Sequence, residues 1–284
     1  MRLSRRQLLA GMAAASLRLG SQPGPRTGPL ICLYSRALPG VDIYQIATVL
    51  NGLGCDGCDL SVQPGGSVLP QQTAVDLVRV IETLTGSGIE VPIITTSFRS
   101  AVEPWARNVL YVAGGSGVRL FRPGFWNYPG AALAQLGSQI AVMATLGRAY
   151  GMGMGVPNNG GEAALHGLDP AWVGYDFDPS QTAGASLETA LPRIKMVLLR
   201  DARKEKDNLV PCPLGEGMVD WPTFFDALAR VKFSGPLTLR PDYPAPDRLA
   251  AIRKDLEFAR AQLTAAYQKH IKSTSHQTSS ERSA

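Results

Sequence analysis

Short apolar segments recur along this chain at intervals that suit β-strands separated by α-helices. Eight of them have the composition of buried strands: residues 30–34, 57–62, 91–95, 118–121, 152–156, 172–177, 194–199 and 236–239. Most are separated by segments with apolar residues on one helical face: residues 41–53, 71–85, 104–113, 129–150, 183–192, 221–232 and 247–269. This alternation predicts an α/β fold in which eight parallel strands close into a single-domain (β/α)₈ TIM barrel.

The connection after the fifth strand is the weakest unit of this pattern. Residues 160–168 are too few for a full crossover helix. Just before it, glycines alternate through residues 151–155, and Asp176 follows about twenty residues later, as in a dinucleotide-binding loop. These glycines lie within a predicted strand and lead to Pro157 rather than to a helix. We therefore expect no dinucleotide site.

The last unit, residues 213–243, is the most informative. A glycine-rich loop ends at Asp220, a good helix N-cap, and Pro222 stands just inside the predicted helix. Gly235 and Pro236 then open a short apolar strand. This is the loop, helix and strand expected at the end of a barrel, and it points to a site built from loops.

Composition supports one globular barrel. The chain has 284 residues, 45% of them hydrophobic and 18% charged, with a net charge of +5. Charges alternate in sign through residues 200–206, which indicates a solvated loop rather than a nucleic-acid patch. We expect the barrel to span residues 29–271, followed by a disordered Ser/Thr-rich tail at 272–284.

Residues 1–28 are predicted to be an export signal and linker. Arg5 and Arg6 precede a weakly apolar run, residues 8–15, that is too short to span a bilayer. The segment resembles a twin-arginine signal, which implies the Tat machinery as a partner and a periplasmic or extracellular location. Arg18 lies just beyond the apolar run, and a disordered basic N-terminus is the alternative.

The four cysteines include a pair, Cys55 and Cys58, with the spacing of metal ligands. No second pair follows, and a zinc site needs four ligands. We interpret the pair as buried core cysteines, with a disulfide as the alternative.

Candidate site residues lie where the predicted strands end, because barrel active sites gather there. The selected catalytic candidates are Asp178, Glu216 and Asp201, and the selected ligand-binding candidates are Arg122, Trp126, Asn158, Asn159, Gln181, Arg200, Arg240 and Asp242. Arginine, amide and tryptophan side chains suit a polyhydroxylated ligand, because they donate to hydroxyls and stack on a sugar face.

Phrases at the strand ends resemble the sugar phosphate isomerase/epimerase family, the xylose isomerase-like TIM barrels. They include residues 53–60 (Leu-Gly-Cys-Asp-Gly-Cys-Asp-Leu), residues 64–70, residues 174–178 (Gly-Tyr-Asp-Phe-Asp) and residues 213–221. The resemblance covers residues 29–268. It implies a divalent metal held by carboxylates and a histidine, beside groups that move a proton or hydride between adjacent sugar carbons.

The chain departs from that family at most metal positions. The family's Asp-x-x-His motif is Asp178-Pro-Ser-Gln181 here, so the carboxylate is kept and the imidazole is absent. Asn158 and Asn159 stand where the family often has histidines or a glutamate, a family histidine position falls at Leu198, and Arg240 stands where it tends to have a glutamate. The three histidines of the chain, His166, His270 and His276, match none of these positions.

These departures make a bound metal improbable. A catalytic divalent site needs three or so protein ligands, and Asp178 is the one retained. A guanidinium such as that of Arg240, about 4 Å from a cation, costs about 4 kcal/mol at an effective dielectric constant of about 20. We therefore expect no tightly bound Mn²⁺, Mg²⁺, Co²⁺ or Zn²⁺.

Three hypotheses about function remain at this point. The first is an exported isomerase or epimerase acting on a carbohydrate or polyol, with Asp178 as ligand or base and Glu216 and Asp201 as acid/base partners. The second is a non-catalytic barrel that binds a sugar or sugar acid through its arginines. The third is a different reaction on the same scaffold. The arginines at metal-adjacent positions favour the second.

Overall fold

Eight parallel strands form a closed barrel. The computed structural model describes residues 28–128, 132–133, 135–160, 162–181, 186–206 and 208–281, and the side chains of all of these except residues 126–127 and 272–281. The barrel strands are β1 (Ile31–Tyr34), β2 (Gly57–Val62), β3 (Glu90–Thr96), β4 (Leu120–Arg122), β5 (Gly153–Pro157), β6 (Val173–Phe177), β7 (Ile194–Leu199) and β10 (Leu237–Leu239). They pair in the order β1-β10-β7-β6-β5-β4-β3-β2. The predicted (β/α)₈ barrel and all eight predicted strands are confirmed.

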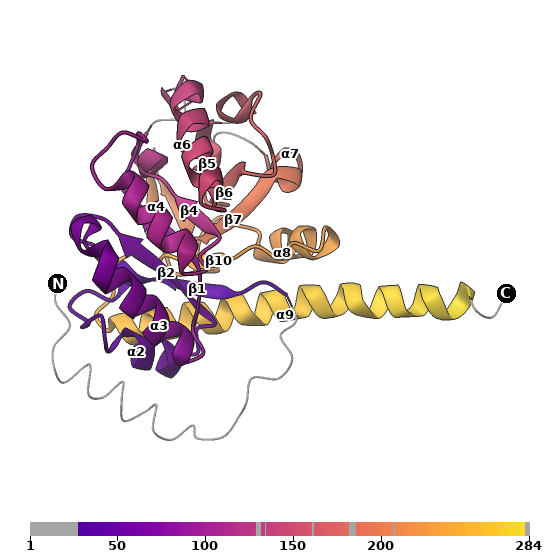
Figure 1. The fold of residues 1–284 in the computed structure, drawn as a ribbon. Helices are drawn as coiled ribbons and strands as arrows, with labels where there is room; N and C mark the ends of the chain where they lie inside the picture. The colour runs from indigo at the N-terminus through magenta and orange to yellow at the C-terminus, as the bar shows by residue number, and fades with distance from the viewer. Residues whose placement is uncertain are drawn as a thin grey trace.

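Helices surround this barrel (Figure 1). They are α2 (Ile46–Leu53), α3 (Val78–Gly86), α4 (Ala106–Gly115), α6 (Gly137–Ala149), α7 (Leu187–Ala190), α8 (Trp221–Arg230) and α9 (Arg248–Glu281). The connection between β5 and β6 holds short 3₁₀ turns, Asn158–Gly160 and Glu162–Leu165, in its described part, as its length predicted. Helix α8 begins as expected, because the side chain of Asp220 accepts a hydrogen bond from the backbone N–H of Thr223.

Each barrel strand has two faces with different roles. One face is apolar and packs against the helices, as with Leu237 and Leu239 of β10 in the hydrophobic core. The residues between them point toward the barrel axis. Polar side chains on the inner face, such as Asp59 and Asp176, are fully buried. The inner face therefore contains charged side chains that need partners inside the barrel.

The segment predicted as a solvated loop is instead an antiparallel hairpin. Strands β8 (Asp201–Glu205) and β9 (Asn208–Cys212) pair over their full lengths. Arg203, Lys204 and Glu205 are exposed, so charged residues do face solvent as the alternating charges indicated. The hairpin does not pack an apolar face on the barrel core, so its sequence lacks the alternation of apolar and polar residues that predicts a strand.

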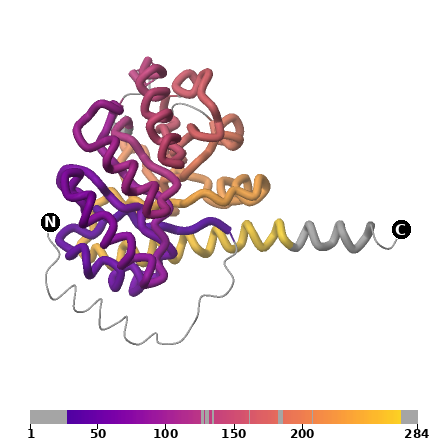
Figure 2. The backbone as a smooth tube through the Cα atoms, in the orientation of Figure 1, coloured from indigo at the N-terminus to yellow at the C-terminus, as the bar shows by residue number. Residues whose placement is uncertain are grey.

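The C-terminal helix extends further than expected. Helix α9 packs along α8 and α2 (Figure 2) and continues to Glu281, where a disordered tail from Lys272 was predicted. The segment contains no glycine or proline, and once a helix is anchored each added residue gains one hydrogen bond at no further nucleation cost. In Figure 1 its end projects beyond the barrel.

The cysteines are core residues. Cys32, Cys55, Cys58 and Cys212 are all buried and unpaired, as we interpreted Cys55 and Cys58. Burial raises the pKa of the Cys55 thiol to about 12. Within the described part of the chain, no helix has the length and apolar character needed to cross a membrane.

Candidate functional site

A buried ion triad lies inside the barrel. Arg122 of β4 donates from Nε to Oδ2 of Asp176 at 2.6 Å and from Nη2 to Oδ1 of the same carboxylate at 3.0 Å. Its Nη1 donates to Asp59 of β2, which also accepts from Thr95 Oγ1 at 2.7 Å. Strands β2 and β6 each lie two strands away from β4, so the guanidinium lies across the barrel interior. Arg122 is 1% exposed.

Glycines on the neighbouring strand leave room for this triad. Gly155 of β5 lies between β4 and β6, and a Cβ added there would stand 2.8 Å from Met196 Sδ and 3.1 Å from Asp176 Cβ. Gly153 and Gly155 lie in β5, as predicted, whereas Gly151 lies in the turn before it with a φ of 70°. A side chain at Gly155 would press on Met196 and on Cβ of Asp176, the residue that holds Arg122.

The triad carries an excess of negative charge. Two carboxylates share one guanidinium, so with both ionised its formal charge is −1. Burial raises the pKa of Asp176, and the nearby Arg122 only partly opposes this effect. Arg122 is thus buried and paired with two carboxylates, and its predicted contact with a ligand stays a prediction.

Asp178 lies just after β6, and its carboxylate accepts three hydrogen bonds. Its Oδ1 accepts from the backbone N–H and the hydroxyl of Ser180, at 2.9 and 2.6 Å. Its Oδ2 accepts from Arg200 Nη1 at 2.8 Å. Asn158 clamps the Asp178 backbone, accepting from its N–H at 3.0 Å and donating to its carbonyl at 3.2 Å. Asp178 is 4% exposed, so the guanidinium of Arg200 is its charged partner.

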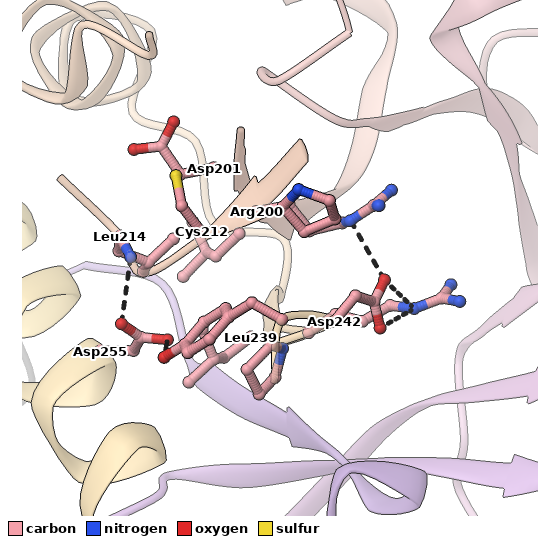
Figure 3. Close-up of a pocket in the computed structure, with 12 residues that line it drawn as sticks. Arg200, Asp201, Cys212, Leu214, Leu239, Asp242 and Asp255 are labelled. Atoms are coloured by element: carbon pink, nitrogen blue, oxygen red, sulfur yellow. Dashed lines mark hydrogen bonds and ion pairs between the residues drawn. The ribbon is translucent and has the colours of Figure 1, made fainter. Parts of the chain in front are cut away.

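A second carboxylate, Asp242, joins two arginines at the mouth. Its Oδ2 lies 3.3 Å from Arg200 Nε and 3.2 Å from Arg240 Nε. The guanidinium of Arg240 also lies over the ring of Tyr34, 5.3 Å from its centroid. The ion pairs thus run from Asp178 through Arg200 and Asp242 to Arg240, across the ends of β6, β7 and β10. Figure 3 shows the part of this chain that Asp242 holds together.

This part of the mouth borders a pocket of about 200 Å³. Its lining is shared by the ends of β7 and β10, the β8–β9 hairpin and α9: Leu199, Arg200, Asp201, Pro211, Cys212, Leu214, Leu239, Arg240, Pro241, Asp242, Tyr243 and Asp255. On the side away from the arginines, Asp255 accepts from Tyr243 and from the Leu214 backbone (Figure 3). Part of this volume is open to solvent, and the part that the centre of a water molecule can occupy is about 10 Å³, so the pocket alone is too small to hold a sugar.

Hydroxyl groups complete the mouth on the side of β1 and β2. Ser35, Ser61 and Ser67 form a closed ring, in which each hydroxyl donates to the next at 3.0, 3.1 and 2.8 Å. Gln63 donates to the Tyr34 hydroxyl at 2.9 Å, and burial raises the pKa of Tyr34. The ring ties the loop after β2 to the end of β1, which gives Ser67 a structural role.

Two of the three catalytic candidates lie apart from this chain of ion pairs. Asp201 is buried, and its carboxylate accepts from the backbone N–H groups of Gly215, Gly217 and Val219 and from Trp221 Nε1. It anchors the glycine-rich loop, and the acid/base role predicted for it stays a prediction. Glu216 is 45% exposed and pairs with Lys254 of α9 at 2.7 Å.

The remaining candidates are Asn159, Gln181 and Trp126, and the structure describes the side-chain contacts of only some of them. Asn159 donates to the Tyr128 carbonyl at 3.2 Å, and its own buried Oδ1 has no hydrogen-bond partner among the described residues. The backbone N–H of Gln181 closes a turn onto the Asp178 carbonyl at 3.2 Å. The side chain of Trp126 lies outside the described residues. Its predicted contact with a ligand stays a prediction.

Sequence reasoning missed the acidic half of the triad. Asp59 and Asp176 lie inside predicted strands rather than at their ends, where the search for polar residues was made. A signal was present, because an aspartate within an apolar strand is costly to bury without a partner. Arg122, at the end of a third strand, was available as that partner.

The donor set does not fit a divalent cation. Among the residues that the structure describes, no group of three or more His, Cys, Asp or Glu side chains converges on one point. Asp178, the metal ligand that the resemblance implied, already binds a guanidinium and a serine, and Asp242 binds two guanidiniums. A cation at this position would lie beside Arg200, with its carboxylate ligands already occupied.

Comparisons with known proteins agree with the fold. Residues 130–262 match the model of the xylose isomerase-like TIM barrel family. No curated protein matches the chain. A xylose isomerase domain protein from Planctomyces limnophilus is similar in structure, with a TM-score of 0.64 and 16% identity, over 87% of this chain and 100% of that one.

Two further solved structures show the same architecture. An L-ribulose 3-epimerase has a TM-score of 0.64 and 15% identity, over 85% of this chain and 96% of its own. A xylose isomerase-like TIM barrel protein from Mycobacterium smegmatis, solved in complex with magnesium, has a TM-score of 0.58 and 15% identity, over 84% and 97%. Identities this low establish a shared fold. The chain is therefore similar in architecture to sugar isomerases and epimerases.

Proposed function

We propose that this protein binds a neutral carbohydrate or polyol at the mouth of its barrel, without a divalent metal. The observation that carries the proposal is the 2.8 Å hydrogen bond from Arg200 Nη1 to Asp178 Oδ2. Asp178 is the family's retained metal ligand, and here its charge is balanced by a side chain of the protein itself. The role of the family's cation is thereby replaced by a fixed guanidinium.

The polar groups of the mouth support a carbohydrate as the ligand. Arg200 and Arg240 are 25% and 16% exposed, so each presents part of its guanidinium to the mouth. Tyr34 and Gln63, which are 6% and 2% exposed, are hydrogen-bonded to each other and support this side of the mouth. Guanidinium groups hydrogen-bond sugar hydroxyls, and sugars are what the similar epimerase structures bind by name.

Charge balance favours a neutral ligand over a sugar acid. The linked ion pairs of the mouth contain two guanidiniums, of Arg200 and Arg240, and two carboxylates, of Asp178 and Asp242, so this set of four is formally neutral. The triad beneath adds a formal charge of −1. A ligand carboxylate would have to displace Asp242 before it could pair with either arginine. The sugar-acid alternative is therefore the weaker one.

The positions of the carboxylates favour binding over family-type catalysis. An acid/base catalyst needs a lone pair or a proton within reach of the substrate. The carboxylate of Asp178 accepts three hydrogen bonds and that of Asp201 accepts five, and Glu216 pairs with Lys254 on the exposed rim. We infer that the protein keeps the scaffold of an isomerase and uses its mouth to hold a sugar.

A thermal-shift screen tests this proposal. The purified protein is heated with D-psicose, D-tagatose, L-ribulose, D-xylose, sorbitol or D-glucuronate, each in EDTA and in Mn²⁺. We expect a neutral sugar or polyol to raise the melting temperature equally in both buffers, and Arg200→Met to abolish the shift. Stabilisation that requires Mn²⁺, or that is unchanged in Arg200→Met, would contradict the proposal.

We also propose that residues 1–28 direct export by the twin-arginine route. This rests on Arg5 and Arg6 and on the short apolar run after them. A reporter fused to residues 1–30 should reach the periplasm, and replacing both arginines by lysine should stop it. Export that is indifferent to this replacement would count against the signal.

A further inference from the structure

Asp242 occupies the place that the carboxylate of an acidic sugar would take. A single carboxylate oxygen, Oδ2, lies within ion-pair distance of two arginines from different strands, at 3.3 Å from Arg200 Nε and 3.2 Å from Arg240 Nε. Both arginines are partly exposed toward the mouth, and Asp242 itself is 34% exposed. Figure 3 shows the side chain of Asp242 facing that of Arg200.

Two guanidiniums converging on one carboxylate form an anion site. Here the anion belongs to the protein. Arg200 is held in place from its other side by Asp178, through Nη1, and Arg240 by its position over the Tyr34 ring. Both arginines therefore have further contacts to hold them when Asp242 is replaced. Without the Asp242 carboxylate, the two guanidiniums would stay in position to bind the carboxylate of a ligand.

We propose that Asp242 is a specificity-determining residue that excludes carboxylated sugars from the mouth and leaves it selective for neutral ones. A ligand carboxylate entering beside Arg200 and Arg240 meets a like charge and finds its two partners already taken. Discrimination by a repulsive group is a general route to specificity. This inference rests on the proposed function, because it concerns the ligand of the same mouth.

The test compares D-glucuronate with D-glucose, which differ only in a carboxylate at C6, by calorimetric titration in EDTA. The wild-type protein should bind glucuronate no more tightly than glucose. Asp242→Ala, which removes the carboxylate and leaves its space, should bind glucuronate at least tenfold more tightly than the wild type does. Asp242→Asn, which removes the charge alone, should show a smaller gain, and it serves as the test if the alanine variant does not fold.

Controls separate local recognition from net charge. Glu188→Ala changes the charge of the protein by the same amount at an exposed pair with Arg230, and it should leave glucuronate binding unchanged. Adding Arg240→Met to Asp242→Ala should remove the gain. A gain below tenfold in a folded Asp242→Ala variant, the same gain in Glu188→Ala, or wild-type binding of glucuronate tenfold above glucose would overturn the inference.

Failure of the proposed function would look different. If no neutral sugar or polyol of the screen stabilises the wild type, the proposed ligand is wrong. A gain in glucuronate binding by Asp242→Ala would still occur in that case, because it requires only the two arginines.

Discussion

Arg200 donates a hydrogen bond to Asp178 at 2.8 Å, and the same guanidinium lies 3.3 Å from Asp242. One side chain thus bridges the two carboxylates of the barrel mouth. Asp178 is the position that the sequence resemblance implied as a metal ligand. Its charged partner in this protein is the guanidinium of Arg200.

The first prediction concerns the buried triad. Arg122→Met replaces the guanidinium with an apolar side chain and leaves Asp59 and Asp176 without their cation inside the barrel. Breaking a buried ion pair from one side costs about 3–5 kcal/mol. We expect urea denaturation to show a loss of that size in the free energy of unfolding.

The matched control is Arg230→Met, at an exposed pair with Glu188. We expect it to change the free energy of unfolding by no more than about 0.5 kcal/mol. An Arg122→Met variant that is as stable as this control would refute a stabilising role for the triad.

The second prediction concerns the pH dependence of stability. Burial raises the folded-state pKa of Asp176, whereas an unfolded aspartate titrates near about 3.9. The folded state therefore binds this proton more tightly. The stabilising contribution of this proton to the free energy of unfolding is fully present below about pH 4. It is lost as the pH rises through the folded-state pKa of Asp176.

Asp176→Asn replaces the ionisable carboxylate with a neutral amide of nearly the same size. The unfolding free energy of the wild type minus that of the variant should therefore fall as the pH rises above about 4. Chemical denaturation in a series of buffers measures the difference. A difference that grows with pH would mean that Arg122 outweighs burial at this carboxylate.

The third prediction separates loop anchoring from catalysis. Asp201→Ala removes the acceptor of four backbone N–H groups and of the Trp221 indole; the backbone groups are those of Ala202, Gly215, Gly217 and Val219. An unsatisfied buried donor costs about 1–3 kcal/mol, so we expect a loss of at least about 2 kcal/mol in unfolding free energy. Glu216→Ala, at the exposed rim, should leave the unfolding midpoint unchanged. Equal stability of the two variants would exclude the anchoring role.

The fourth prediction concerns the thiols. All four cysteines are buried, and the pKa of Cys55 is raised to about 12, so they are protonated and shielded at neutral pH. A thiol-specific reagent should label none of them in the native protein and all four after unfolding. Fast labelling of the native protein, detected by mass spectrometry, would be inconsistent with this packing.

The barrel was predictable because its signals are local. Each strand from residues 57–62 to 194–199 is short, apolar and bounded by turn residues, and each intervening helix has one apolar face. Asp220 caps its helix through a residue only three positions away, which a sequence displays directly. Such features depend on neighbours along the chain.

The triad depends on residues far apart in the chain. Arg122 meets Asp59 and Asp176, which are 63 and 54 positions away, only because the barrel closes. The pairing of Arg200 with Asp178 and Asp242 likewise requires the ends of β6, β7 and β10 to meet. Reading strand ends identified the mouth residues individually, but it could not show that the arginines there are already paired.

The central claim is that a guanidinium replaces the family's cation at Asp178. Calorimetric titration of the wild-type protein and of Asp178→Ala with Mn²⁺ tests it most directly. We expect neither protein to bind Mn²⁺ with micromolar affinity, because Asp178 is held by Arg200 and Ser180. Micromolar binding by the wild type that disappears in Asp178→Ala would contradict the account.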